Sequence, residues 1–426
     1  MVGCLPVASA AATYDTHVPR ILLLLPTATY RASDFLDAAR KLDVKVIVAS
    51  EQRQTMSEMM GDRALVVDFD HPEASAEAIV KRAKEKPLDA VVGVDEQGVL
   101  VAALAAARLG LAGNPPEAVA ASTDKITMRK AFSAAGIPQP EHAIAGPDAD
   151  VARLAREVGL PCVVKPVSLS ASRGVIRADD PPAASAAALR IREILADAGQ
   201  DTDAPLLIER YVPGVEVAVE GLLRGGALET LAIFDKPDPL EGPYFEESIY
   251  VTPSRLPAET LDTVSRLTAS AAAALGLLEG PIHAEVRIDS DRLWILELAA
   301  RSIGGLCSRS LRSRLGLSLE ELILRHALGM PLDDLGHESV ASGVMMLPIP
   351  KAGMLREVRG QAYARATPGV DELDISIPLG RTVRTLPEAD RYLGFLFAHG
   401  KTPEAVERTL RSAHGQLEIL IDDPPE

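Results

Sequence analysis

The sequence has few cysteines, few aromatic residues and no apolar run long enough to cross a bilayer. Its three cysteines, Cys4, Cys162 and Cys307, are widely separated and match no metal-ligand spacing. That excludes a disulfide framework and indicates a reducing compartment. Cys162 follows a proline within an apolar run, so we expect it to be a buried strand residue and not a nucleophile.

Positive charge is also scarce. The formal net charge of -16 excludes nonspecific binding to nucleic acid, which requires a basic surface. A phosphate site would therefore have to be built locally, from a few cations and backbone N–H groups. The first residues lack the basic start of a signal peptide, so we predict a cytoplasmic protein with an N-terminal extension over residues 1–19.

Apolar strands alternate regularly with helices in the first third of the chain. This alternation is typical of a parallel sheet covered on both faces, so we predict an α/β domain over residues 20–121. Asp95 and Glu96 would lie at the carboxyl edge of that sheet, where open α/β sheets bind ligands, although solvated loop acids explain them equally well. The expected elements are the strands Arg20–Leu25, Val44–Ala49, Ala64–Asp68 and Ala90–Val94 and the helices Ala32–Leu42, Ala74–Glu85 and Val99–Leu109.

A second region follows the break at Asn114-Pro115-Pro116 and mixes helices with hairpins in an α+β pattern. We predict one domain over residues 122–338, with a small lid subdomain at about 140–210, and a separate β-rich domain over residues 339–426. The expected helices are Ser122–Ala135, Ala183–Ala196 and Glu259–Leu275, and the expected strands include Cys162–Pro166, Leu206–Arg210, Val215–Leu223, Leu228–Phe234, Ile282–Ile288 and Leu293–Leu298.

Several short segments of this region have the chemistry of a nucleotide site. Lys125 opens a helix, Lys165 ends a strand, and the loop at 168–174, with Ser170 and Ser172, offers N–H groups to phosphates. The run Glu209-Arg210-Tyr211-Val212, followed by Glu216, has the form of an adenine-binding hinge with a carboxylate for ribose hydroxyls. Taken singly, solvated lysines, a serine loop and a hairpin with exposed acids explain these segments as well.

The strongest signal is a pair of acidic strands. In the strand Ile282–Ile288, the period of two places His283, Glu285 and Arg287 on one face, which is costly in a core without partners. Glu297 ends the next strand and can meet Glu285 across the hairpin. Two facing carboxylates favour Mg²⁺, which completes its octahedron with phosphate oxygens and water. An exposed sheet face is the alternative.

These residues, in this order, resemble the ATP-grasp superfamily over about residues 20–335. The resemblance implies ATP and Mg²⁺, or Mn²⁺, as cofactors. It implies that Lys125 and Lys165 contact phosphates, that Ser170 and Ser172 belong to the ATP site, and that residues 209–212 line adenine. It also implies that Glu216 binds ribose, that Glu285 and Glu297 hold the metal, and that Arg301 faces the reacting group.

One departure from the superfamily pattern narrows the resemblance to a single branch. Many relatives have Glu-x-Asn where this chain has Glu297-Leu298-Ala299, so a metal would have fewer protein ligands. The run from Glu297 through Ala299, Ala300 and Arg301 to Gly304 instead resembles the Glu-x-Ala-Ala-Arg-x-x-Gly pattern of bacterial L-amino-acid ligases, as does the C-terminal stretch.

Within that branch, the resemblance assigns Glu96 to a substrate amino group and His283 to the acyl pocket, with Arg301, Gly304 and Gly305 also binding substrate. It names His283, Lys165 and Arg301 as catalytic. Some relatives carry a bulky aromatic residue near the position of Gly305, and its absence here predicts a roomier pocket. The segment Asp238–Pro253 would be a lid over ATP or, nearly as well, a solvated loop.

The implied function is an ATP-dependent carboxylate–amine ligase that forms an amide through an acyl phosphate and releases ADP and phosphate. Its partners would be small carboxylates and amines, with no nucleic acid and no membrane, and family members are often homodimers. Two alternatives stay open, a bicarbonate-using carboxylase on the same site and a nucleotide-binding module without turnover.

Overall fold

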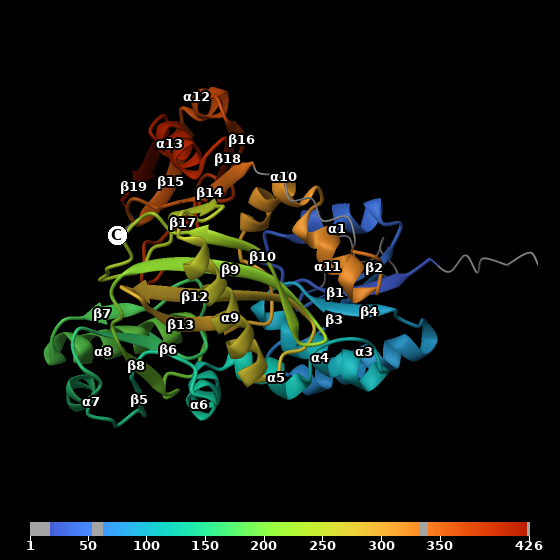
Figure 1. Cartoon of the computed structure of the whole chain (residues 1–426), viewed down its shortest axis with the longest axis horizontal. Helices are drawn as coiled ribbons and strands as arrows, with labels where there is room; N and C mark the ends of the chain where they lie inside the picture. The colour runs from blue at the N-terminus through green and yellow to red at the C-terminus, as the bar shows by residue number, and fades with distance from the viewer. Residues whose placement is uncertain (1–17, 53–62, 333–339, 424–426) are drawn as a thin grey trace, which may run out of the picture.

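The computed structural model describes residues 18–52, 63–332 and 340–423 of the chain (Figure 1). Most of the predicted N-terminal extension, and Cys4 with it, lies outside these ranges. The first third forms the predicted parallel sheet, in the strand order β3-β2-β1-β4. Its elements are β1 (Arg20–Leu24), α1 (Ala32–Lys41), β2 (Lys45–Ser50), β3 (Ala64–Val66), α3 (Pro72–Glu85), β4 (Ala90–Gly93) and α4 (Glu96–Leu109).

The predicted helix Ser122–Ala135 is wrong in its extent, because two helices meet at Asp124. Asp124 has extended backbone angles, and its side chain accepts a hydrogen bond from Thr127 N at 2.6 Å, so it caps the second helix. Lys125 is therefore the first residue of a helix, as predicted. The two helices are α5 (Pro116–Thr123) and α6 (Lys125–Ala135).

A small antiparallel sheet follows, in the order β5-β8-β6-β7, and two helices pack on it. It lies at the lower left of Figure 1. We call residues 142–210 the small subdomain. Its elements are β5 (His142–Ala145), α7 (Val151–Val158), β6 (Cys162–Pro166), β7 (Ile176–Ala178), α8 (Pro181–Asp197) and β8 (Leu206–Arg210).

An eight-stranded antiparallel sheet forms the centre of the molecule, in the order β13-β12-β9-β10-β11-β14-β18-β16. The last three strands come from the predicted C-terminal domain, so the proposed boundary at residue 339 divides one continuous sheet. The elements are β9 (Val215–Arg224), β10 (Ala227–Asp235), β11 (Ile249–Thr252), α9 (Ala258–Leu275), β12 (Gly280–Asp289), β13 (Arg292–Ala299), η2 (Cys307–Leu311), α10 (Arg312–Leu315), α11 (Leu319–Ala327), β14 (Ala341–Leu347), β16 (Val370–Ile375) and β18 (Gly394–Gly400).

The C-terminal part also contains helices, although the sequence predicts short strands and turns there. A three-stranded sheet, β17-β15-β19, stands beside the central sheet. Helix α13 has an apolar stripe, with Val406, Leu410 and Ala413 buried, and packs on β14 and β18. The elements are β15 (Gly353–Arg359), α12 (Gln361–Ala366), β17 (Thr382–Val383), α13 (Pro403–His414) and β19 (Glu418–Asp422).

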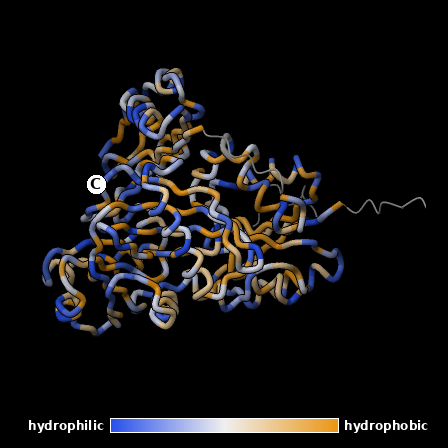
Figure 2. Tube along the Cα trace, viewed as in Figure 1, coloured by the Kyte–Doolittle hydropathy of each residue, from blue (hydrophilic) through white to orange (hydrophobic). Residues whose placement is uncertain are grey.

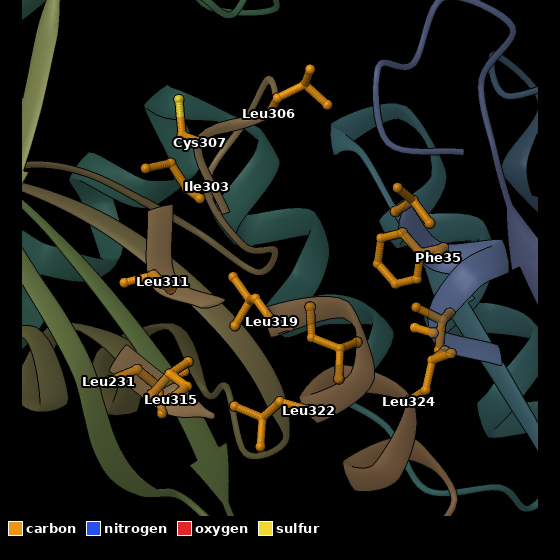
Figure 3. Packing of buried hydrophobic residues seen from close by; sticks show 14 of the residues in the cluster. Phe35, Leu231, Ile303, Leu306, Cys307, Leu311, Leu315, Leu319, Leu322 and Leu324 are labelled. Carbon is orange, nitrogen blue, oxygen red and sulfur yellow. The ribbon is translucent and has the colours of Figure 1, made fainter. Parts of the chain in front are cut away.

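One buried core joins the parts. It contains Phe35 of the first sheet's α1, Leu231 of the central sheet, Ile303 of the loop after β13, and Leu319 and Leu322 of α11 (Figure 3). In Figure 2 the hydrophobic colour is concentrated along the inner strands, while the hydrophilic colour is more frequent toward the outer edge of the molecule. This packing fixes the edge of the first sheet against the loop that follows β13, which is where the candidate site lies.

Candidate functional site

A pocket of about 390 Å³ lies where the carboxyl edge of the first sheet, the small subdomain and the central sheet meet. The sequence-predicted site residues come from distant parts of the chain, and the fold brings all of them to the wall of this pocket. They are Glu96, Lys125, Lys165, Ser170, Ser172, Glu209, Arg210, Tyr211, Val212, Glu216, His283, Glu285, Glu297, Arg301, Gly304 and Gly305. Their individual roles stay predictions.

Lys165 at the end of β6 is held by a buried counter-ion. Its Nζ lies 2.7 Å from Glu209 Oε2, and Arg129 Nε donates to Glu209 Oε1 at 2.6 Å. Burial raises the pKa of the Glu209 carboxyl, but the charges of Arg129 and Lys165 outweigh burial and lower it to about 2. Burial also lowers the pKa of Lys165, against the opposing effect of Glu209. The Glu209 carboxylate thus positions Lys165, and the sequence reasoning missed Arg129.

Lys125 connects the serine loop to the predicted metal ligands. Its Nζ donates to Leu169 O at 3.1 Å and lies 3.5 Å from Glu297 Oε1. Within that loop, Ala171 and Ser172 both have φ of 56°, in the left-handed region that non-glycine residues rarely adopt. Such backbone strain is often found where a loop grips a ligand.

The predicted hinge contains an aromatic stack. The rings of Tyr211 and Phe245 are stacked with centroids 6.3 Å apart, and the Arg177 guanidinium lies 4.5 Å from the Tyr211 ring centroid. Phe245 belongs to the predicted lid segment 238–253, which also contributes Leu240 and Glu247 to the pocket wall. The hinge and this segment therefore form one wall.

Glu216, the predicted ribose ligand, is buried and already paired. Its Oε1 accepts from Lys236 Nζ at 2.6 Å and its Oε2 from Arg287 Nε at 2.8 Å. Lys236 also contacts Glu247 and lies 3.1 Å from Glu285 Oε1, so one ammonium joins three carboxylates. Sequence reasoning missed Lys236, because its partners are set by strand register across residues far apart in the chain.

Glu285 and Glu297 are register partners on β12 and β13. Strand residues alternate as the period of two predicts, since His283, Glu285 and Arg287 line the pocket while Ile282, Ala284 and Val286 lie in the core. The oxygens of Glu216, Glu247 and Glu285 also lie within 4.8 Å of one another. Carboxylate oxygens are the ligands that Mg²⁺ prefers, and the two lysines beside them suit the phosphates that Mg²⁺ binds. Lys236 already compensates part of the negative charge of these carboxylates.

His283 is tied to the loop that follows β13 through Glu220. His283 Nδ1 contacts Glu220 Oε1, and Glu220 Oε2 accepts a hydrogen bond from Ile303 N at 3.0 Å. Burial lowers the pKa of His283, but the charge of Glu220 outweighs burial and raises it to about 9. Glu220 is itself 1% exposed, and neither it nor its role was predicted from the sequence.

Arg301, in the loop that follows β13, pairs with Glu96 at the start of α4. The Nε of Arg301 donates to Glu96 Oε2 at 2.6 Å, and its Nη1 donates to Ser302 O at 3.0 Å. Burial lowers the pKa of Arg301, but the charge of Glu96 outweighs burial and raises it. Two residues that were predicted separately as substrate ligands are therefore joined by an ion pair.

The predicted roomier pocket at Gly305 is wrong, because a side chain at this position would point into the buried core and not into the pocket. An ideal Cβ at Gly305 would lie 2.7 Å from the Phe395 ring, so a side chain there would run into the buried core behind the pocket. Gly305 also has φ of 60°. The missing side chain therefore makes room for Phe395 of β18.

The two described cysteines are not equipped as nucleophiles. Cys162 and Cys307 are both buried, and burial raises the pKa of each thiol, that of Cys162 to about 11. Cys162 is a strand residue in β6, as predicted. Among the described residues, no helix has both the length and the apolar character needed to cross a membrane.

Comparison with known families assigns three segments. Residues 36–113 match the ATP-grasp N-terminal domain, residues 158–310 the ATP-grasp domain, and residues 345–422 the L-amino acid ligase C-terminal domain 2. These matches confirm the predicted fold class and the resemblance to ATP-grasp proteins of the L-amino-acid ligase branch.

Curated and solved relatives agree with the family matches. The chain is 27% identical over 290 residues to alanine–anticapsin ligase of Bacillus subtilis (strain 168), covering 61% of each chain. It is 28% identical over 244 residues to D-alanine–D-alanine ligase of Ectopseudomonas mendocina, covering 54% of this chain and 72% of that one. The crystal structure of L-amino acid ligase from Bacillus licheniformis superposes with a TM-score of 0.81 at 23% identity, covering 95% of this chain and 99% of that one. The chain thus spans about three fifths of the length of the anticapsin ligases that it matches.

Proposed function

We propose, since this chain belongs to the ATP-grasp superfamily, that it is an ADP-forming ligase that joins a small carboxylate, such as an amino acid, to an amine. The observation that carries the proposal is the meeting of Lys125, Lys165, Glu285, Glu297 and Arg301 in one pocket. The C-terminal domain match and the ligase names of the relatives support an amide-forming reaction.

The first step would be attack of a substrate carboxylate oxygen on the γ-phosphorus of ATP, with ADP leaving and an acyl phosphate formed. Lys125 and Lys165 would bind phosphate oxygens and offset the charge that develops on them. Mg²⁺, or Mn²⁺, held by Glu285 and Glu297, would supply further neutralisation of phosphate charge when bound. Arg301, fixed by Glu96, would orient the carboxylate.

In the second step the amine nitrogen would attack the acyl carbon, the bond between that carbon and the phosphate oxygen would break, and phosphate would leave with the bonding electron pair while the amine gives up one proton. Arg301, Gly304 and Gly305 line the pocket, and the Arg301 guanidinium with backbone N–H groups near the two glycines would stabilise the oxyanion of the tetrahedral intermediate. No side-chain nucleophile is needed, which agrees with the buried, high-pKa thiols of Cys162 and Cys307.

The test is an ATP-dependent phosphate-release screen over amino acids, singly and in pairs, with mass spectrometry of every product. We expect amide and ADP in equal amounts for at least one pair, and their loss in Glu297→Gln. Phosphate release at background for all acids and amines would contradict the proposal. Hydroxylamine should trap an acyl hydroxamate, whereas release of pyrophosphate would indicate adenylation instead.

The same screen separates the two alternatives. Bicarbonate-dependent ADP formation without any amine would favour a carboxylase. ATP binding without turnover across the whole panel would favour a nucleotide-binding module. The homodimer and the cytoplasmic location are also proposals, which light scattering and cell fractionation test.

A further inference from the structure

A short segment between β17 and β18 reaches out of the C-terminal sheet toward the pocket. Residues 385–389 form a turn in which the N–H groups of Glu388 and Ala389 both donate to Thr385 O, at 3.1 and 3.0 Å. We call residues 384–392 the clasp. Its two ends contact different parts of the molecule.

The first end of the clasp holds the small subdomain. Gly174 N, at the end of the serine loop, donates to Pro387 O at 3.0 Å. Arg190 Nε on α8 lies 2.8 Å from Glu388 Oε1, and Arg384 Nη1 lies 3.1 Å from Asp197 Oδ2 at the end of α8. One backbone bond and two ion pairs therefore fasten the subdomain that carries Lys165 and the serine loop.

Arg190 extends this contact to the predicted lid segment. Its Nη1 donates to Tyr244 OH at 2.6 Å, and its guanidinium lies 5.4 Å from the Tyr244 ring centroid. Tyr244 in turn forms a β-bridge with Ile176 of β7. The Arg190 side chain thus joins the clasp, the lid segment and the small subdomain at one point.

The second end of the clasp belongs to the pocket. Asp390 and Tyr392 line the pocket wall. Tyr392 packs edge-on against Phe395, with ring centroids 6.0 Å apart, and Tyr30 in the loop between β1 and α1 packs on the same ring at 5.2 Å. This end of the clasp therefore packs on Phe395 of β18, the same ring that Tyr30 contacts.

We propose that the clasp holds the small subdomain closed over the reacting phosphate, and that its pocket end and its subdomain end act as one unit. The proposal rests on the proposed function, because an acyl phosphate is the species that must be kept from water. If water takes the place of the amine at the acyl carbon, the acid is regenerated, phosphate is released and the net reaction is ATP hydrolysis. A weakened clasp should therefore consume ATP without forming amide. Arg190 and Glu388 are positioning residues in this scheme.

The test compares Arg190→Ala, Glu388→Ala, the double variant and the charge swap Arg190→Glu/Glu388→Arg by their ratio of ADP released to amide formed. We expect each single variant to raise the ratio roughly two- to fivefold, the size typical of a partly exposed ion pair. The double variant should add little, and the swap should restore the ratio. Arg153→Ala, which breaks the exposed Arg153–Glu157 pair within the same subdomain, is the control and should leave the ratio unchanged. An unchanged ratio in the single variants, or an equal rise in the control, overturns the proposal.

A second measurement does not depend on ligase activity. Hydrogen exchange of residues 168–174 is followed with the ATP analogue AMP-PNP bound, in the wild type and in Arg190→Ala, Tyr392→Ala and Arg153→Ala. We expect faster exchange in the first two variants and no change in the third, because Tyr392 acts on the loop through the clasp. An unchanged exchange rate in Arg190→Ala would overturn the proposal that the clasp holds the small subdomain. An unchanged rate in Tyr392→Ala would overturn the coupling between the two ends of the clasp. A wild type that forms no amide but shows these exchange differences would contradict the proposed function alone.

Discussion

Glu285 on β12 and Glu297 on β13 stand directly opposite each other, and a β-bulge follows Glu285 in the ladder. In an antiparallel pair, opposite residues point to the same face of the sheet, so the two carboxylates share the pocket wall. Lys236 lies 3.1 Å from Glu285 Oε1 and Lys125 lies 3.5 Å from Glu297 Oε1. The pair is therefore held between two cations beside the place proposed for the phosphates.

Replacing Glu297 by Gln should abolish most of the activity without unfolding the protein. The change removes one proposed metal ligand and its charge, so we expect kcat to fall by roughly 100-fold or more, as for loss of a major electrostatic contact. Glu297 is partly exposed, so the thermal midpoint should change little. Glu193→Gln, an exposed carboxylate on α8, is the matched control for steady-state kinetics and should retain wild-type kcat. Retention of kcat in Glu297→Gln would contradict the assignment.

Replacing Glu96 by Gln should weaken binding of the amino-acid substrate and leave binding of ATP unaffected. The change removes the partner of Arg301 Nε, 2.6 Å away, and a charge that the resemblance assigns to a substrate amino group. We expect KM for that substrate to rise by roughly tenfold, about the effect of one charge-assisted hydrogen bond. Kinetics with each substrate varied in turn check this, and a rise confined to KM for ATP would place Glu96 in a different role.

Substituting Gly305 by Ala should destabilise the fold. The added Cβ would lie 2.7 Å from the Phe395 ring, and φ of 60° disfavours any side chain. We expect the free energy of unfolding in urea to fall by about 1–3 kcal/mol. Gly304→Ala is the control, because an ideal Cβ at Gly304 would meet no described atom beyond its chain neighbours within 4 Å. In a Phe395→Leu background, the loss of stability caused by Gly305→Ala should be smaller than in the wild type. Equal losses of stability for Gly305→Ala and Gly304→Ala would refute the steric account.

The Glu209 ion pairs should contribute stability that acid removes. Because the folded pKa of Glu209 is about 2, below the value of 4.5 for an unperturbed carboxyl, its contribution is fully present above about pH 4.5 and declines as the pH falls toward 2. The stability difference between wild type and Glu209→Gln should therefore shrink below pH 4.5 by about 1.4 kcal/mol per pH unit. Urea unfolding at several pH values between 7 and 3.5 measures it. A difference that stays constant below pH 4.5 would show that the ion pairs do not carry it.

Local patterns were sufficient to predict much of the fold and many candidate residues. The strands β6 and β8 have the predicted bounds, and the period of two in β12 placed its polar face correctly. The cap at Asp124 shows that the predicted helix was started too early, although Asp is a common N-cap residue and the residues around it are polar.

The missed residues act through contacts between segments that are far apart in the chain. Lys236, Glu220 and Arg129 are ordinary charged residues in the sequence, and their importance follows from partners on other helices and strands. Phe395, which fills the space beside Gly305, lies in the C-terminal part of the central sheet, and no local signal joins the two. Tertiary pairing of this kind is not encoded in any single window of sequence.

The claim that this site activates a carboxylate by phosphorylation is tested most directly with an acid substrate labelled with ¹⁸O in its carboxylate, in the acid–amine pair that the screen identifies. If the carboxylate attacks the γ-phosphorus, one ¹⁸O passes to the released phosphate for every amide formed, and mass spectrometry of the phosphate should show that one-to-one transfer. Release of unlabelled phosphate together with amide, or appearance of the label in AMP, would contradict the account.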